Sequence, residues 1–252
     1  MGNLKKLQEH PFIKNLFADA RIITKGRTFK ISDTHLPSNT EFLEWEYHIH
    51  TVGFFTMHLL HLCNQINSAI EFISNYNYKS SEAKEKRIEH LEYNIENYII
   101  RVASIKDRTL QVFNAVFHLC MDEASVSEST ILNNLKVHRT KLLKLFPKLT
   151  KTVKRASGDR NTIIHRHTYM NAEIRKLHIL YSDFILGVSI NNRPNEDTFK
   201  SFRTERLKKY LKEKKVEMKE TNEAIFSVLF EIFTELDKEY CKVKKLLQEK
   251  DL

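Results

Sequence analysis

The sequence predicts an all-α protein, an antiparallel bundle of four to six helices of which several are unusually long. Three observations lead to this prediction. Glycine and proline are scarce, with 5 and 4 residues among 252, whereas turn-dense all-β folds need many more of both. Long segments carry apolar residues at helical spacing, and no segment alternates strongly enough to indicate a strand. Two Ser-x-x-Glu sequences, which are typical of helix N-termini, precede such segments.

Residues 1–38 are the least regular part and are predicted to be an N-terminal extension of a bundle domain that spans residues 39–252. A short amphipathic helix is expected around Pro11–Ile22. The first long helix is expected to begin near Ser38, at the capping box Ser38–Glu41, and to end near Asn75.

A second long helix is predicted from about Glu82 to Met121. Its apolar seam has the alternating 3-4 spacing of a bundle helix, broken at Thr109, and comprises Ile88, Leu91, Ile95, Tyr98, Val102, Ile105, Val112, Val116 and Leu119. A polar row lies about 100° from this seam and comprises Asn97, Arg101, Ser104, Arg108 and Gln111. It is either a solvated flank or one wall of a cleft between helices.

A third helix is predicted from the capping box Ser125–Glu128 to about Phe146, and Pro147 is expected in the first turn of a further short helix. That helix should stop near Gly158, because glycine suits the position after a helix. Another helix is expected over Ala172–Leu186. Asn195 should cap a last long helix that ends near Lys250, whose apolar residues are Ile225, Phe226, Leu229, Phe230, Ile232, Phe233 and Leu236.

The chain is basic, with 41 lysines and arginines against 32 acidic residues and a net charge of +9. Residues 129–158 contain no Asp or Glu. Within them, basic residues spaced three and four apart share one helix face, which favours an anion-binding surface over an ordinary solvated face. The candidate RNA-binding residues are Lys141, Lys144, Lys148, Lys151, Lys154 and Arg155. A second basic run, residues 200–219, is diluted by glutamates and is interpreted as an ordinary solvated face.

Directly after the acid-free stretch comes Gly158-Asp-Arg160-Asn161-Thr-Ile-Ile-His165-Arg-His167. Arginine is permanently charged and can grip a phosphate, and histidine exchanges a proton near neutral pH. Together they supply a charge clamp and a general acid or base for attack on a phosphodiester.

Arg160-Asn161-x-x-x-His165 resembles the ribonuclease signature of the HEPN superfamily. The segments Asn97–Arg101, Lys106–Phe117 and Leu145–Leu149 are similar to a bacterial toxin and defence branch of it, and the likeness covers about residues 40–190. The resemblance implies a HEPN-like bundle that dimerises with two motifs facing each other across a cleft. It also implies RNA cleavage without metal or other cofactor, by 2′-hydroxyl attack that leaves a cyclic phosphate and a 5′-hydroxyl.

On that resemblance His165 is the general acid or base, Arg160 holds the phosphate, and Asn161 orients the pair. His167, Arg101 and Arg108 are candidates for supporting roles. In one toxin branch a tyrosine that a partner enzyme modifies stands two residues after the histidine. Here His167 occupies that place, and the nearest tyrosine is Tyr169.

Two functions are therefore weighed. The first is a metal-independent endoribonuclease, a toxin or antiphage effector that works as a homodimer, with the seam of the second long helix as a packing surface and an antitoxin or regulatory protein as a candidate partner. The alternative is a non-catalytic helical scaffold that binds RNA or protein.

Metal is not expected. A site built from His58, His61 and Cys63 lacks the carboxylates of a di-metal bundle site, and the pair His165 and His167 is no stronger. Cys63, Cys120 and Cys241 are widely spaced and are interpreted as buried, reduced thiols of a cytoplasmic protein. The most apolar window, residues 45–62, contains one glutamate and four histidines, so no membrane association is expected.

Overall fold

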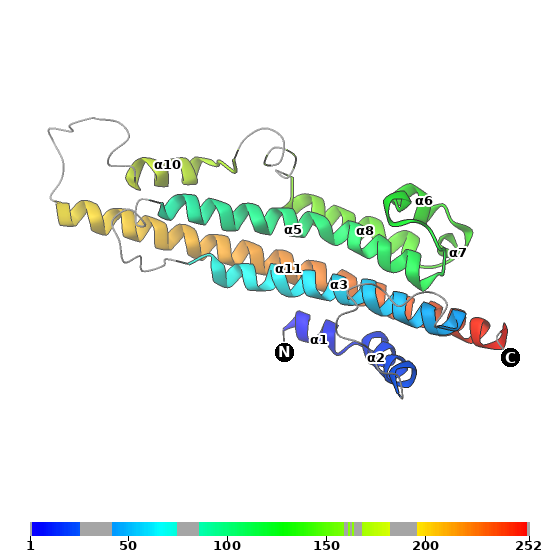
Figure 1. The fold of residues 1–252 in the computed structure, drawn as a ribbon. Coiled ribbons are helices and arrows are strands. Elements are labelled where there is room, and N and C mark those ends of the chain that lie inside the picture. The colour runs from blue at the N-terminus through cyan, green and yellow to red at the C-terminus, as the bar shows by residue number, and fades with distance from the viewer. Residues whose placement is uncertain are drawn as a thin grey trace. The chain divides into compact units, whose positions relative to one another are not determined.

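The computed structural model describes residues 2–25, 42–74, 86–158, 161, 163, 168–181 and 196–250. These residues form helices and their connections, with no strand among them, and the predicted all-α fold is confirmed. No helix in these stretches is long and apolar enough to cross a membrane. The elements traced in Figure 1 are α1 (Asn3–Gln8), α2 (Pro11–Thr24), α3 (Glu44–Phe72), α5 (Arg87–Val116), the 3-10 helix η2 (Glu123–Ser125), α6 (Glu128–Leu132), α7 (Leu135–His138), α8 (Leu142–Ala156), α10 (Ala172–Tyr181) and α11 (Glu196–Lys250).

The chain divides into two compact units. Unit 1 consists of Met1–Asn64, Ser104–Lys154 and Glu223–Leu252, and unit 2 consists of Gln65–Ala103 and Arg155–Asn222. Helices α3, α5 and α11 each contribute residues to both units. The 55 residues of α11 correspond to a length of about 82 Å at the usual helical rise.

In unit 1 the expected N-terminal helix is present as α2, with Pro11 at its first position. Its N-cap is a histidine, because the Nδ1 of His10 accepts a hydrogen bond from the Phe12 amide at 3.1 Å. The Phe12 ring lies 5.4 Å from Phe233 of α11, measured between ring centroids. The Asp19 carboxylate accepts hydrogen bonds from the Tyr240 hydroxyl at 2.6 Å and the Lys244 ammonium at 2.7 Å. Helix α2 is thereby fixed along α11.

Helix α8 also packs on α11 in unit 1. Its apolar side, Leu142, Phe146, Leu149 and Val153, is buried. The Lys141 amide just before α8 donates to Glu235, and Lys148 one turn into the helix reaches Glu231. Because residue numbers rise along α8 as they fall along α11, the two helices run antiparallel.

The α5 seam is buried as predicted from Ile88 to Val116, whereas Leu119 beyond the helix is only half-buried. The apolar pattern of the seam is interrupted at Thr109, which is fully buried and whose hydroxyl donates to the Ile105 carbonyl at 2.8 Å. Because the seam already packs inside one chain, it is not available as a dimer surface, and that part of the dimer prediction is wrong.

The second helix was expected to reach Met121, but α5 ends at Val116. His118 has φ 47° and Cys120 has φ 54°. The Leu119 amide donates back to the Asn114 carbonyl and the His118 amide to the Ala115 carbonyl, both at 3.0 Å, which is the Schellman ending of a helix. Glycine usually holds the left-handed position in this motif, so a histidine there gives no signal in the sequence.

The helix predicted from Ser125–Glu128 to Phe146 is broken into α6, α7 and the start of α8. The N-cap is Ser127, which forms a reciprocal box with Thr130, and Ser125 instead ends η2. Pro147 does not begin a helix but lies inside α8, where it removes only the one amide donor that would face the Leu143 carbonyl. Helix α8 ends at Ala156, close to the predicted stop at Gly158.

The two remaining predicted caps, Ser38–Glu41 and Asn195, lie outside the described residues. Helix α3 begins at Glu44, with the Leu43 amide donating to the Glu46 carboxylate at 3.0 Å. The predicted apolar face of α11 is buried apart from Phe230, which is 39% exposed and lies with its ring against His10.

Candidate functional site

The basic face predicted on α8 is exposed. All six candidate RNA-binding side chains are at the surface, and they are Lys141, Lys144, Lys148, Lys151, Lys154 and Arg155. The opposite side of the same helix is buried. The spacing of the lysines thus gives a helix with one apolar and one basic side, and we refer to these six residues as the α8 basic face.

Two carboxylates of α11 lie beside this face in unit 1. The Lys148 ammonium is 2.7 Å from the Glu231 carboxylate, and the Lys141 amide donates to Glu235 at 3.3 Å. Burial by itself raises the pKa of Glu235, but hydrogen bonds from Lys238 and the Lys141 amide outweigh it, and this pKa lies below its ordinary value. Residues 129–158 contain no acidic residue, but in the fold two glutamates of α11 lie next to them.

Apart from Lys148, the long cations of this face are unpaired. Lys141, Lys144, Lys151, Lys154 and Arg155 form no side-chain ion pair with any residue that the structure describes. Like charges spaced at i,i+3 and i,i+4 repel one another, so such a row is stabilised by an anion brought from outside. This arrangement suits a polyanion that runs along the helix.

The Arg-Asn-x-x-x-His motif falls in the segment Arg155–Asn222 of unit 2. Arg160, His165 and His167 lie outside the described residues. Asn161 is described and is helical with an exposed side chain. The structure therefore fixes the chain on both sides of the motif, at the end of α8 and at Thr168.

The chain just after the motif is held in unit 2 by a buried polar network centred on Tyr169. The Tyr169 amide donates to the Glu96 carboxylate of α5 at 2.6 Å. Its hydroxyl accepts hydrogen bonds from Asn171 at 3.0 Å and from Lys214 of α11 at 3.4 Å, and the Lys214 ammonium also lies 5.5 Å above the Tyr169 ring. Two long helices thus anchor the chain four residues after His165.

The same network starts α10. The Asn171 side chain caps this helix by accepting a hydrogen bond from the Ile174 amide at 2.8 Å. Lys214 is only 10% exposed and is paired with Glu217. Burial raises the pKa of the neighbouring Tyr210 hydroxyl, so this phenol stays protonated and can only take part in hydrogen bonds.

Sequence reasoning missed Glu96, Tyr169 and Lys214. They lie 73 and 45 residues apart from one another along the chain, and no short motif joins them. The one available signal was the position of Tyr169 directly behind the motif.

The polar row of α5 is half-buried rather than a fully solvated flank. Arg101 is half-buried and donates to Asn97 at 2.9 Å, within the same helix. Gln111 donates to the Glu123 carbonyl at 3.0 Å, and its buried side-chain oxygen has no partner. Arg108 is exposed and makes no ion pair with described residues. Arg101 and Gln111 are therefore used in hydrogen bonds within α5 and between α5 and η2. Arg108 is the exposed cation of this row that has no partner among the described residues.

Of the two metal candidates, the pair His165 and His167 lies outside the described residues, and His58, His61 and Cys63 are not placed to hold a metal ion together. Within the described ranges no group of three His, Cys, Asp or Glu side chains is placed to hold a metal ion. His58 is exposed with its ring 4.4 Å from Phe54. Cys63 is fully buried, and burial raises the pKa of its thiol. Cys120 and Cys241 are free and exposed, so the prediction that all three cysteines are buried is wrong for these two.

Comparison with known proteins gives one clear match. The model of the Cthe2314-like HEPN family matches residues 46–237, which is more than half of the 252-residue chain and includes the motif. No curated protein and no solved structure shows a significant match to the chain.

Proposed function

The chain belongs to the HEPN family, and we propose that it is a metal-independent endoribonuclease. The observation that carries the proposal is the position of the Arg160–His165 motif. It lies within the matched residues and directly after a helix whose exposed face holds unpaired cations. A basic surface supplies the sequence-independent part of RNA affinity, and the motif supplies the chemistry.

In the proposed reaction the RNA 2′-hydroxyl oxygen attacks the adjacent phosphorus atom. The hydroxyl proton passes to a histidine, the bond from phosphorus to the 5′-oxygen breaks, and the leaving oxygen takes up a proton. The products are a cyclic phosphate and a 5′-hydroxyl. Arg160 neutralises the charge that develops on the phosphate, His165 transfers protons, and Asn161 orients the two side chains.

The two proton transfers favour two histidines, and the motif supplies one per chain. We therefore propose a homodimer in which two motifs meet in one cleft, as a symmetric interface allows. His167, Arg101 and Arg108 are secondary candidates within this proposal. Its biological setting would be a toxin or antiphage effector held in check by an antitoxin or other regulatory protein.

The test of the chemistry is cleavage of total RNA in the presence of EDTA, with analysis of the product ends. His165→Ala should slow cleavage by about 10²–10⁴-fold, since it removes the proton-transfer group. Arg160→Ala should cost a similar factor, and Arg160→Lys should restore only part of the rate, since a lysine lacks the bidentate fork. His167→Ala is the matched control, expected to lose less because a helix would place it about 200° around its axis from His165.

If His165→Ala cleaves RNA at the wild-type rate while its melting temperature is unchanged, the motif is not the active site. Activity that is absent, or lost on addition of EDTA, would instead favour a scaffold that binds RNA or protein without cutting it. Light scattering that finds a fully active monomer of about 30 kDa, the mass of one chain, would contradict the dimer.

The α8 basic face is tested separately, through binding. The double variant Lys144→Glu/Lys151→Glu should weaken affinity for RNA of any sequence and lower the dependence of log affinity on log salt by about 0.7 per lost phosphate contact. Lys208→Glu/Lys212→Glu makes the same charge change at two exposed lysines of α11 and is the matched control. Equal losses in the two double variants would make the effect one of net charge rather than of this face.

A further inference from the structure

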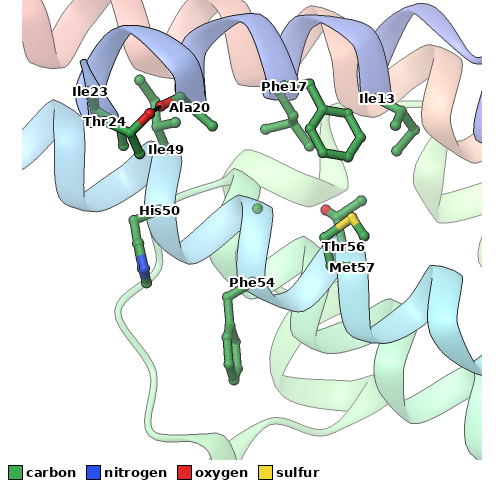
Figure 2. A pocket seen from close by; sticks show the side chains of 12 residues that line it. Ile13, Phe17, Ala20, Ile23, Thr24, Ile49, His50, Phe54, Thr56 and Met57 are labelled. Atoms are coloured by element: carbon green, nitrogen blue, oxygen red, sulfur yellow. Dashed lines mark hydrogen bonds between the residues drawn. The ribbon is translucent and has the colours of Figure 1, made fainter. Parts of the chain in front are cut away.

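A pocket between α1 and α11 in unit 1 is not used by the proposed cleavage reaction. Its volume is about 310 Å³. The described residues that line it are Asn3 and Lys6 of α1 and Phe226, Ser227, Phe230 and Glu231 of α11. The groove between α2 and α3 in Figure 2 differs from it, because that groove has mainly apolar walls, and no lysine, arginine, aspartate or glutamate is among the described residues that line it. The α1–α11 pocket therefore offers both an apolar surface for packing and polar groups for recognition.

The apolar part of this pocket is aromatic. Phe226 is buried, whereas Phe230 is 39% exposed. The Phe230 ring is held by His10, whose ring centroid lies 4.5 Å away with the two planes at 78°. An exposed phenylalanine ring beside a hollow is a surface on which a flat aromatic ligand can stack.

The polar side chains around the two phenylalanines have groups left to bind a ligand. Asn3, Lys6 and Ser227 make no side-chain hydrogen bond or ion pair with any part of the chain that the structure describes. Glu231 uses its Oε1 to bind the Lys148 ammonium at 2.7 Å, and its Oε2 bonds to no described residue. A flat ligand with hydrogen-bonding groups on its edge fits this combination of rings and polar groups.

The ion pair between Lys148 and Glu231 joins the pocket to the α8 basic face. Lys148 lies about one helical turn from Lys144 and from Lys151 on that face. Near the pocket, Lys6 and Lys148 outnumber the single carboxylate of Glu231, so the rim disfavours a cation and favours a ligand with an anionic group. An aromatic face, a polar edge and an anionic group together are the features of a nucleotide. A strand that follows the basic face passes Lys148, and with it the rim of the pocket.

We propose that this pocket holds one unstacked base of a bound RNA strand, and that this base carries an amino group. The inference rests on the RNA binding in the proposed function. The base stacks on Phe230, its amino group donates to Oε2 of Glu231, and the neighbouring phosphates lie on Lys148 and the adjoining lysines of the α8 basic face. Adenine, guanine and cytosine have such an amino group, whereas uracil presents a carbonyl oxygen there, which the carboxylate repels. The volume is roughly twice that of the 150 Å³ cavity that accommodates benzene, so one-ring and two-ring bases both fit.

The experiment measures binding of the full chain to fluorescein-labelled 2′-O-methyl oligonucleotides by fluorescence anisotropy. Their blocked 2′-hydroxyl cannot attack the phosphate, so binding is measured apart from cleavage. Strands of about twelve nucleotides, within the usual site sizes for single-strand binding, consist of cytidine or of uridine, whose bases have the same ring size but carry an amino group or a carbonyl at the same position. The cytidine strand should bind about tenfold more tightly.

Glu231→Gln tests the contact to the amino group. It should bring the ratio of the two affinities to about one, because an amide can donate to a carbonyl as well as accept from an amino group. Releasing Lys148 raises the affinity for both strands alike, so the ratio is the quantity to compare. Glu220→Gln, at an exposed glutamate of α11, is the matched control and should keep the preference for cytidine. A preference unchanged in Glu231→Gln would overturn the assignment.

Phe230→Ala tests the stacking. It should weaken binding of the cytidine strand by about five- to hundredfold and leave the salt dependence unchanged, since no phosphate contact is lost. Phe230→Tyr keeps a ring and should bind like wild type. Phe202→Ala, at another phenylalanine of α11 that is 50% exposed, is the matched control and should change nothing. Equal losses in Phe230→Ala and Phe230→Tyr would contradict stacking.

The outcomes separate this pocket from the proposed ribonuclease. Equal affinity for the two strands, with no effect of Phe230→Ala, would overturn the base pocket and leave RNA binding by the α8 basic face standing. No binding of either strand would overturn both. A preference for cytidine that depends on Glu231 would support the pocket even if RNA were not cleaved. Cytidine monophosphate that binds as tightly as the strand would assign the pocket to a free nucleotide and overturn the RNA assignment.

Discussion

The two units bury their polar groups in different ways. In unit 2 the polar side chains that are themselves buried are hydrogen-bonded, and among the described residues of this unit only the half-buried Arg87, Tyr181 and Arg206 have a buried polar atom without a hydrogen bond. The Tyr98 hydroxyl lies 3.0 Å from the Asn222 side-chain oxygen, Asn222 donates to the Ile66 carbonyl at 3.0 Å, and Glu92 lies 2.7 Å from His178. In unit 1 several stand alone among aromatic and aliphatic side chains, including both ring nitrogens of His48 and the hydroxyls of Thr56 and Thr150.

The two arrangements have different consequences for the position of side chains and for stability. A partnered polar network costs stability when any member is lost, but it fixes each side chain in one place. Unit 2 uses such a network to hold the chain next to the candidate motif. A buried polar group without a hydrogen bond holds no neighbouring side chain in place and lowers the stability of the fold. Such groups in unit 1 therefore mark positions where protonation or a substitution should change the free energy of unfolding. Four measurements test this contrast.

The largest expected effect is the loss of a partnered group in unit 2. Asn222→Leu removes the amide that bonds to the Tyr98 hydroxyl and the Ile66 carbonyl, and leaves Tyr98 only its longer hydrogen bond to the Met218 carbonyl at 3.3 Å. It should lower the free energy of unfolding by about 3 kcal/mol. Chemical denaturation measures it. Asn64→Leu is the control, since Asn64 is exposed and, among the residues that the structure describes, pairs only with Gln8. A loss below about 1 kcal/mol would contradict the importance of the network.

The next effect depends on pH and concerns His48 in unit 1. This ring is 1% exposed, stacks on Tyr240 and meets His118 edge to face. Burial, assisted by the charges of His118 and Lys244, lowers the pKa of His48 from 6.5 to about 3. The unfolded chain therefore takes up a proton at a higher pH than the folded protein does. The stability from a neutral His48 is complete above pH 6.5 and is lost as the pH falls toward 3.

His48→Phe should remove this loss. Relative to wild type, the variant should gain up to about 1.4 kcal/mol of stability for each pH unit below 6.5, or about 2 kcal/mol at pH 5. Denaturation curves at pH 7, 6 and 5 measure the gain. A difference between the two proteins that stays constant over this range would mean that His48 titrates normally in the folded state.

The third effect links the unit 2 network to activity, and it rests on the proposed ribonuclease function. Glu96→Ala removes the acceptor of the Tyr169 amide and should lower kcat about tenfold, equivalent to about 1.4 kcal/mol, with KM for an RNA oligonucleotide unchanged. Glu96→Gln keeps an acceptor oxygen and should retain most of the rate. Equal losses in both variants, or a change in KM alone, would rule out a positioning role for Glu96.

The smallest effect is a gain. Thr150→Val in unit 1 replaces a buried, unpartnered hydroxyl by a methyl group and should raise the free energy of unfolding by about 0.5–1 kcal/mol. Thr109→Val is the matched control, because the Thr109 hydroxyl is equally buried but bonded to Ile105, and it should be neutral or destabilising. If both variants lose stability, the Thr150 hydroxyl has a partner in solution.

Much of the fold follows from the sequence, for a physical reason. Helical spacing of apolar residues reflects which side of a helix is buried, and the predicted apolar residues within α5 and α11 are all buried apart from Phe230. Helix ends depend instead on local backbone geometry. His118 ends α5 in a conformation usually held by glycine, and Ser127 rather than Ser125 caps α6.

The candidate site was accessible from the sequence only in its local parts. The spacing of Lys144 and Lys151 predicts one exposed face because both lie on a single helix. The carboxylates of Glu231 and Glu235 beside that face, and the contact of Glu96 with Tyr169, join residues distant in the chain, and single-helix patterns carry no information about them. The missing hydrogen bond of the Thr56 hydroxyl has no sequence signal either, because it depends on which groups from other parts of the chain pack around Thr56.

The interleaving of the two units decides how this protein can be dissected genetically. Unit 2 is built from Gln65–Ala103 and Arg155–Asn222, and the residues between them belong to unit 1. No continuous fragment therefore contains one unit whole without part of the other, and any truncation within α11 cuts a helix that serves both. Deletion alleles will report the loss of folding, whichever activity they were meant to remove. Alleles that separate the proposed RNA cleavage from the proposed RNA binding have to be single substitutions within an intact chain.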